Sequence, residues 1–77
     1  MNISPSTIEK GIYKHSKSGR LYDVLGIALH TETSEQLVVY APRYSSEHQL
    51  FARPYSMFIE KIEVDGRQVM RFVKINE

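Results

Sequence analysis

At 77 residues the chain has room for one domain with a small hydrophobic core, because short chains bury a smaller fraction of their surface than long ones. The absence of cysteine excludes disulfides and thiolate metal sites, and ten Lys and Arg against nine Asp and Glu leave a formal net charge of +1. That charge creates no overall field favouring nucleic acid or an anionic membrane. Residues 1–10 lack the basic and apolar regions of a secretory signal, and no apolar run approaches the roughly twenty residues of a membrane span. We therefore expect a cytoplasmic protein without a membrane partner.

The first ten residues are expected to form an N-terminal turn or a frayed segment. Ser4 can cap free N–H groups, and Pro5 suits the first helical position. The next five residues, 11–15, alternate apolar or aromatic with cationic positions, which predicts a strand with one buried face. Tyr13 and His15 lie on the same face of that strand.

The centre of the chain predicts a long β-hairpin. Two apolar runs, residues 21–29 and 37–41, flank the polar residues 30–36. With residues 31–34 as the tip, antiparallel counting predicts the pairs His30 with Glu35, Ala28 with Leu37, Ile27 with Val38, Gly26 with Val39 and Leu25 with Tyr40. Both faces of this hairpin are apolar near its middle, so the sheet should curl, with a bend or bulge at Gly26.

The segment after the hairpin contains two prolines. Pro42 has no N–H and should end regular pairing. Residues 49–53 predict a short strand ended by Pro54, and residues 55–59 predict one tight turn. Met57 and Phe58 from that turn are expected to fill the end of a barrel.

The C-terminal part predicts a second hairpin. Residues 61–64 and 67–75 flank Asp65-Gly66, a pair that suits a two-residue type I′ turn. Arg71 lies between apolar positions, so its guanidinium needs an acceptor such as Glu60, Glu63 or a carbonyl.

These elements predict an all-β fold. Five or six short antiparallel strands with only short helical turns favour a small SH3-like barrel over residues 11–75, with an OB-type barrel as the second choice. The whole chain, 1–77, is expected to be a single domain.

Several segments, in this order, match a known pattern. They are Gly11-Ile12-Tyr13-Lys14-His15, Tyr22-Asp23-Val24-Leu25-Gly26 with Ala28, His30-Thr31-Glu32-Thr33, Leu37-Val38-Val39-Tyr40, Arg53-Pro54 with Met57-Phe58, and Arg71-Phe72. Together they resemble a bacterial family known as domain of unknown function 1653, over roughly residues 11–73. The resemblance implies no activity, because that family has no assigned function. The chain departs from the family pattern at Phe51, where a tryptophan is common.

The histidines suggest one possible chemistry. His15 and His30 with Glu32 could form a metal site or an acid–base pair, since imidazole is a good ligand that titrates near neutral pH. No recognised ligand spacing is present, however, and the structural alternatives are simple: His15 ends a strand, and His30 pairs with Glu35 or caps the tip. The chain also lacks a cysteine nucleophile, a GxSxG elbow and a glycine-rich phosphate loop. We therefore predict no catalytic residue, no metal and no cofactor.

Arg53 and the tyrosines suggest binding instead. A guanidinium held before Pro54 among tyrosines can hold a carboxylate, a phosphate or a peptide acceptor, whereas the structural alternative is a salt bridge to Glu32, Glu35 or Glu60. Aromatic clefts on small barrels bind peptides, and the same rings with cations could bind single-stranded nucleic acid.

We predict a non-enzymatic bacterial binding or accessory module, with protein or peptide as the expected partner and nucleic acid as a third option. The alternative is a small metal-dependent hydrolase or other enzyme using His15, His30 and Glu32. The predicted binding residues are Tyr13, His15, His30, Glu32, Tyr40 and Arg53.

Overall fold

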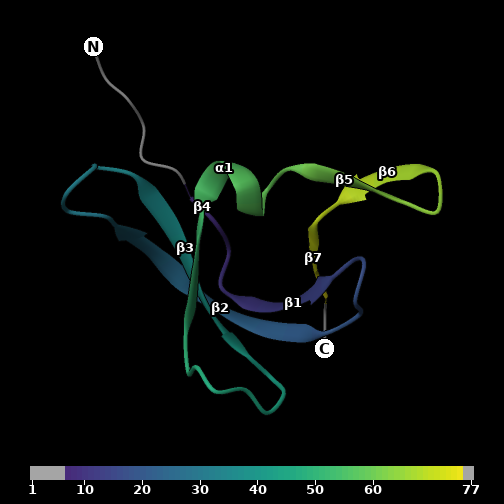
Figure 1. Cartoon of the computed structure of the whole chain (residues 1–77), viewed down its shortest axis with the longest axis horizontal. Coiled ribbons are helices and arrows are strands. Elements are labelled where there is room, and N and C mark those ends of the chain that lie inside the picture. Colours follow the sequence, from purple (N-terminus) through teal and green to yellow (C-terminus); the bar gives the residue numbers. More distant parts are fainter. Residues whose placement is uncertain (1–6, 76–77) are drawn as a thin grey trace.

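The computed structural model describes residues 7–75, which form seven strands and one helical turn (Figure 1). In chain order these are β1 (Gly11–His15), β2 (Leu21–Leu29), β3 (Gln36–Pro42), β4 (Phe51–Pro54), α1 (Tyr55–Phe58), β5 (Lys61–Val64), β6 (Arg67–Met70) and β7 (Phe72–Lys74). Five of the strands form an antiparallel sheet in the order β4-β3-β2-β1-β7, and β5 pairs with β6 separately. The all-β prediction is therefore confirmed.

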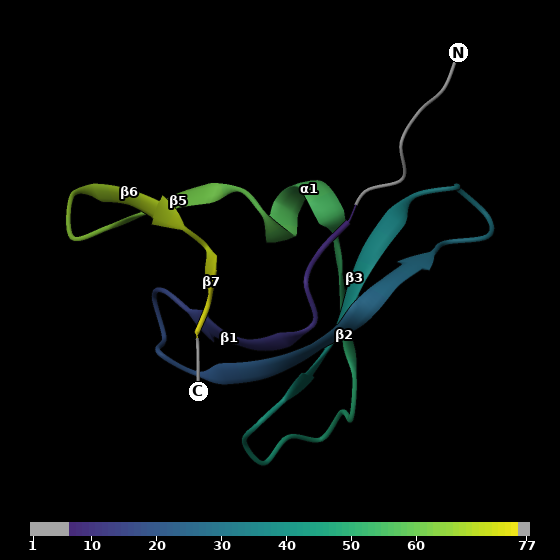
Figure 2. The same cartoon turned by 180° about the vertical axis from the view of Figure 1, so that it is seen from behind.

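The described strands do not close into a barrel. The edge strands of the five-stranded sheet, β4 and β7, are not paired with each other anywhere in residues 7–75. Figure 2 shows, from behind, the β5–β6 hairpin extending to one side of the molecule and the tip of the β2–β3 hairpin to the other. The SH3-like barrel is accordingly not confirmed, although the sheet is strongly bent. No helix in residues 7–75 has the length and apolar character needed to cross a bilayer.

The central hairpin, β2 with β3, follows the predicted register from its tip to its middle. The backbone N–H of His30 donates to the carbonyl of Glu35 at 2.8 Å, and three predicted pairs occur, Ala28 with Leu37, Ile27 with Val38 and Gly26 with Val39. The predicted pairing of Leu25 with Tyr40 is wrong, because the register shifts between Val24 and Gly26 and Tyr40 lies opposite Val24. The bulge falls where it was predicted. Gly26 adopts φ +152° there, a conformation that residues with a Cβ rarely take.

The core occupies the concave face of the bent sheet. Alternation along each strand turns Tyr13 and Tyr22, which are opposite each other, and Val24 and Tyr40, which are also opposite, to the same side. The buried residues are Tyr13, Tyr22, Val24, Val38, Tyr40, Phe58 and Phe72. The core is thus mainly aromatic, which lets a short chain bury a large area with few residues.

The single helical turn, α1, confirms the turn predicted for residues 55–59. Phe58 is 1% exposed and stacks on Phe72 with ring centroids 4.1 Å apart and planes 3° apart. Met57, which was expected to fill the end of a barrel beside Phe58, is instead 44% exposed. Of the two side chains, only Phe58 joins the core.

The second hairpin has the predicted turn, but its return strand is interrupted. Asp65 and Gly66 both have positive φ, +53° and +78°, as a type I′ turn requires. At Arg71 the chain changes partner, because its N–H donates to the carbonyl of Glu60 while its carbonyl accepts from the N–H of Ser16. The following strand, β7, therefore pairs with β1. Seven strands result where five or six were predicted.

The turn or frayed segment predicted for residues 1–10 can be compared with the structure only from residue 7 onwards. Most of the expected turn falls on residues 1–6, which lie outside the described residues. Within the described part, the Tyr13 hydroxyl donates to the carbonyl of Glu9 at 2.8 Å, and the Tyr55 hydroxyl donates to the carbonyl of Thr7 at 3.1 Å. Ile8 packs against the core. Residues 7–9 are therefore held against the domain.

Candidate functional site

Arg53 is the cation that the sheet places on its concave aromatic face. On β4, Arg53 lies opposite Val38, and Phe51, two residues earlier, lies opposite Tyr40, so both side chains share the face of the core. The Nε of Arg53 donates to the Tyr40 hydroxyl at 3.3 Å. Its guanidinium carbon lies 5.7 Å from the ring centroid of Phe72. The guanidinium is thereby oriented by one hydrogen bond and supported by an aromatic ring.

The structural alternative for Arg53, a salt bridge to a glutamate, is not formed. Within residues 7–75 the two ion pairs are Arg43 with Asp23 at 2.8 Å and Arg71 with Glu60 at 2.6 Å. The terminal nitrogens of Arg53 have no hydrogen-bond partner in this part of the chain. A half-buried cation without a counter-ion loses solvation energy, which the Tyr40 hydroxyl and the Phe72 ring offset in part. The arrangement therefore suits binding of an external acceptor, because the two terminal nitrogens of Arg53 can donate together to a carboxylate or a phosphate.

His15 lies close to the same aromatic ring. It ends β1 opposite Phe72, and the two ring centroids are 5.0 Å apart in an edge-to-face arrangement. The Nδ1 atom of His15 accepts the backbone N–H groups of Lys17 at 3.3 Å and Ser18 at 3.2 Å. In the neutral ring the proton is therefore on Nε2. His15 is the strand-end residue that the sequence suggested, with a ring fixed by its own turn.

The electrostatic environment of His15 is cationic. Burial lowers the pKa of His15, and the positive charges of Arg53, Arg71 and Lys17 lower it further. No carboxyl group in the described residues counters this effect at His15. The potential at the His15 ring is therefore positive even though Arg71 is paired with Glu60.

The pKa of His15 offers a direct test of this potential. Arg53→Gln should raise the pKa of His15 towards its ordinary value of about 6.5, because one neighbouring cation is removed. Arg67→Gln is the control variant in the same NMR pH titration, because Arg67 is not among the cations that lower the pKa of His15, and it should leave that pKa unchanged. An unchanged His15 titration would show that Arg53 does not act on this ring.

The same shift predicts the pH dependence of folding. A lowered pKa means that the folded protein binds fewer protons at His15 than the unfolded chain, so stability falls as pH drops from about 6.5 through the lower folded pKa. In urea unfolding followed across this window, His15→Gln should show a smaller loss of stability than wild type. Equal pH slopes would contradict the prediction.

The other predicted site residues do not join Arg53 as a group. Tyr40 does, through its hydroxyl, but the hydroxyl of buried Tyr13 donates to Glu9 and its ring contacts Phe58, so it belongs to the core. Burial raises the pKa of Tyr13, and the negative charge of Glu9 raises it further. His30 and Glu32 occupy the exposed β2–β3 tip, where Nδ1 of His30 accepts the N–H of Glu32 at 3.2 Å. The predicted capping of the tip by His30 is therefore observed.

The set proposed for an enzyme is not assembled. His15 lies beyond the first residue of β2 and His30 just beyond its last, so nine residues of strand separate them, a span of up to about 30 Å if straight. No group of three or more His, Cys, Asp or Glu within residues 7–75 is arranged to hold a metal ion. The geometry does not bring His15, His30 and Glu32 to one centre.

A hollow of about 610 Å³ contains Arg53 and extends past the tyrosines. Its lining residues are Tyr22, Tyr40, Leu50, Phe51, Ala52, Arg53, Pro54 and Met57. Sequence reasoning did not assign Leu50, Phe51 or Met57 to the site, although alternation along residues 49–53 already placed Phe51 on the same face as Arg53. The hollow joins one cation to a wall of mixed polar and apolar surface.

A tyrosine pair adjoins this hollow. The hydroxyls of Tyr22 and Tyr44 lie 3.2 Å apart, and the guanidinium of Arg20 lies 4.4 Å from the centroid of the Tyr44 ring. Burial, together with the hydrogen bond to Tyr44, raises the pKa of Tyr22 to about 12. The same hydrogen bond and Arg20 lower the pKa of Tyr44. The guanidinium of Arg20 is thus engaged with Tyr44, as that of Arg53 is with Phe72 and Tyr40.

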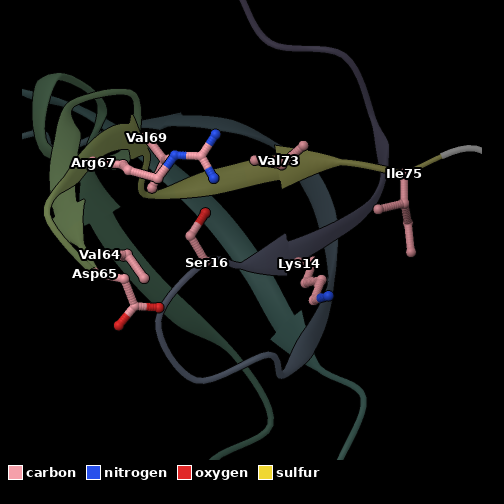
Figure 3. Close-up of a pocket in the computed structure, with 8 residues that line it drawn as sticks. All are labelled: Lys14, Ser16, Val64, Asp65, Arg67, Val69, Val73 and Ile75. Carbon is pink, nitrogen blue, oxygen red and sulfur yellow. The ribbon is translucent and has the colours of Figure 1, made fainter.

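A second hollow, of about 410 Å³, lies between the β5–β6 hairpin and β1 with β7 (Figure 3). Its lining residues are Lys14, Ser16, Val64, Asp65, Arg67, Val69, Val73 and Ile75. The Ser16 hydroxyl is committed to the carbonyl of Met70, and the two cations are exposed side chains accompanied by the carboxylate of Asp65. None of the predicted site residues lines it. The hollow around Arg53 is therefore the stronger candidate.

Comparisons with known proteins agree on the family. The model of a family described as "Protein of unknown function (DUF1653)" matches residues 11–74. A crystal structure of a DUF1653 protein from Bordetella bronchiseptica is similar, with a TM-score of 0.82 and 28% identity, covering 88% of this chain and 87% of that one. No match was found among curated proteins. The strands that position Arg53, Tyr40 and His15 all fall within the matched residues, and the chain belongs to the DUF1653 family of proteins of unknown function.

Proposed function

We propose that this chain is a non-enzymatic binding module that recognises an anionic group of its partner at Arg53. One observation carries the proposal: Arg53 projects onto an aromatic face, its Nε is held by the Tyr40 hydroxyl, and its remaining nitrogens have no acceptor within residues 7–75. His15, whose ring meets Phe72 edge to face, carries a further N–H donor that needs no protonation.

The enzyme alternative receives less support from the geometry. It requires His15, His30 and Glu32 to act on one substrate, and these residues lie at opposite ends of β2. The Nδ1 atoms of both histidines accept local N–H groups, which holds their rings in their own turns. Binding at Arg53 needs no such convergence.

We also propose the finer features of the sequence prediction. The bent sheet followed by a helical turn before the C-terminal strands is best regarded as an open variant of the SH3-like barrel, with residues 1–77 as one domain. A location in the bacterial cytoplasm is consistent with the lack of cysteine.

The test uses small anions and a matched arginine control. Benzoate and phenyl phosphate should produce saturable NMR shifts at the Arg53 Nε–H and the His15 ring, because each combines an anion with an apolar body. Arg53→Gln should weaken their affinity at least tenfold. Arg67→Gln, which changes an exposed arginine of the second hollow, should leave the affinity unchanged.

Two results would overturn the proposal. Either neither anion gives a saturable shift at Arg53, or Arg53→Gln binds both anions as well as wild type does. Thermal unfolding of each variant shows whether its fold is intact, and Arg53→Lys provides a second variant that keeps the charge but loses the fork.

A further inference from the structure

The outer edge of β4 has no partner strand among the described residues. In residues 7–75, β4 pairs with β3 along one edge only, and Figures 1 and 2 show it at the rim of the sheet. Such an edge carries backbone N–H and C=O groups that can pair with another chain. Pro54, which lacks an N–H, marks the end of this short edge.

The hollow around Arg53 follows that edge. Five successive residues, 50–54, line it. Side chains along a strand point alternately to opposite faces, so a hollow reached by all five includes the backbone edge of β4. It also extends over the concave face, where Tyr22 and Tyr40 line it. Met57 of α1, 44% exposed, forms another part of the wall. The shape is therefore a channel alongside an open strand.

The channel combines polar and apolar surface with one positive charge. Leu50, Met57 and Phe51 supply apolar surface, and within residues 7–75 Arg53 is its one cation and no acidic residue lines it. Because Phe51 and Arg53 lie two residues apart on one face, a paired strand would present two side chains with the same spacing. One would be acidic, against Arg53, and the other apolar, against Phe51.

We propose that the open edge of β4 binds an extended peptide segment of a partner protein, which adds a strand to the sheet and places an acidic side chain on Arg53. This inference rests on the proposed function and names its partner class. Main-chain hydrogen bonds would supply affinity, and the alternate side chains would supply specificity.

Single-stranded nucleic acid fits the channel less well. Such ligands need several cations that follow the backbone and aromatic faces on which bases can stack. The channel has a single arginine, and its tyrosines, Tyr22 and Tyr40, are only 8% and 5% exposed. Its rings support the channel from beneath rather than offering faces to a base.

The test is an array of labelled seven-residue peptides, acetylated and amidated at their ends. Each has glutamate at the centre, Val, Leu, Phe or Tyr two residues before or after it, and Ser or Thr elsewhere, and each has a twin with glutamine in place of glutamate. By fluorescence polarisation, wild type should bind the best glutamate peptide at least tenfold more tightly than its twin. Arg53→Gln should abolish this preference, whereas Arg67→Gln should retain it.

Backbone N-methylation of the best peptide tests strand addition itself. Only alternate N–H groups of an added strand face its partner, so methylation at every second position should weaken binding at least tenfold, while methylation between these positions should change it less than threefold. Equal effects at all positions, or none, would overturn strand addition.

Three further outcomes separate the hypotheses. If the small anions bind at Arg53 but no peptide in the array binds, this inference fails and the proposed function stands. If neither binds, both fail. If an eight-residue oligothymidine binds with steep salt dependence while the peptides do not, the partner class is wrong.

Discussion

Phe72→Ala should lower the unfolding free energy by about 3–5 kcal/mol, the range typical of a buried phenylalanine. Phe72 is 4% exposed, stacks on Phe58, and meets Tyr22 and Tyr40 edge to face. It also joins β7 to β1 and supports the guanidinium of Arg53. At the low end of the about 5–15 kcal/mol typical of a folded domain, such a loss leaves only about 0–2 kcal/mol.

Urea unfolding followed by circular dichroism measures this effect. The adjacent Val73, 45% exposed, provides the control, and Val73→Ala should change stability by less than about 1 kcal/mol. Phe72→Leu should lie between the two, since it retains part of the buried volume. A loss below about 1 kcal/mol for Phe72→Ala would show that the aromatic cluster is not the centre of the core.

Glu60→Ala should destabilise the protein by about 1–2 kcal/mol, whereas Arg71→Met should change stability by less than about 1 kcal/mol. Arg71 and Glu60 form an ion pair at 2.6 Å, with side chains 22% and 43% exposed respectively. Removing Glu60 leaves the more buried charge unpaired, in a region that already contains Arg53. Removing Arg71 leaves only a glutamate that water can solvate, so the cost is asymmetric.

A second feature of Arg71 adds to this asymmetry. Its Nε is buried without a hydrogen-bond partner in residues 7–75, so methionine removes an unsatisfied group along with the charge. Urea unfolding of both single variants and the double variant measures the coupling, and 1 M NaCl should reduce the cost of Glu60→Ala because half-exposed pairs are screened. If Arg71→Met proved more damaging than Glu60→Ala, the ion pair would not be the reason that Arg71 is tolerated.

Local chemistry explains which elements could be predicted. The β2–β3 register follows from counting outward from a four-residue tip, and Asp65-Gly66 specifies its turn by conformational preference alone. The same holds for the bulge at Gly26. Each depends on residues close in sequence, so the pattern of side chains is sufficient evidence.

The candidate site was predictable only in part, because its residues come from segments that are distant in sequence. The sequence identified Arg53 as a rigidly held guanidinium and placed Tyr13 and His15 on one face, yet it grouped them with His30 and Glu32. His15 and the pair His30 and Glu32 lie at opposite ends of β2, and nothing in their sequence spacing shows that distance. Whether Arg53 had a glutamate partner was likewise undecided until the positions of three separate segments were known.

The sequence by itself determined an all-β chain, its two hairpins, the helical turn at residues 55–58 and the residues able to fill a core. Alternation and turn preference act over a few residues and therefore remain visible in the primary structure. Only the tertiary structure decided that strand pairing passes from the β5–β6 hairpin to β1 at Arg71, that β4 is an open edge within residues 7–75, and that Arg53 forms no ion pair in this part of the chain. These features depend on contacts between distant segments, which form only when the whole sheet is assembled.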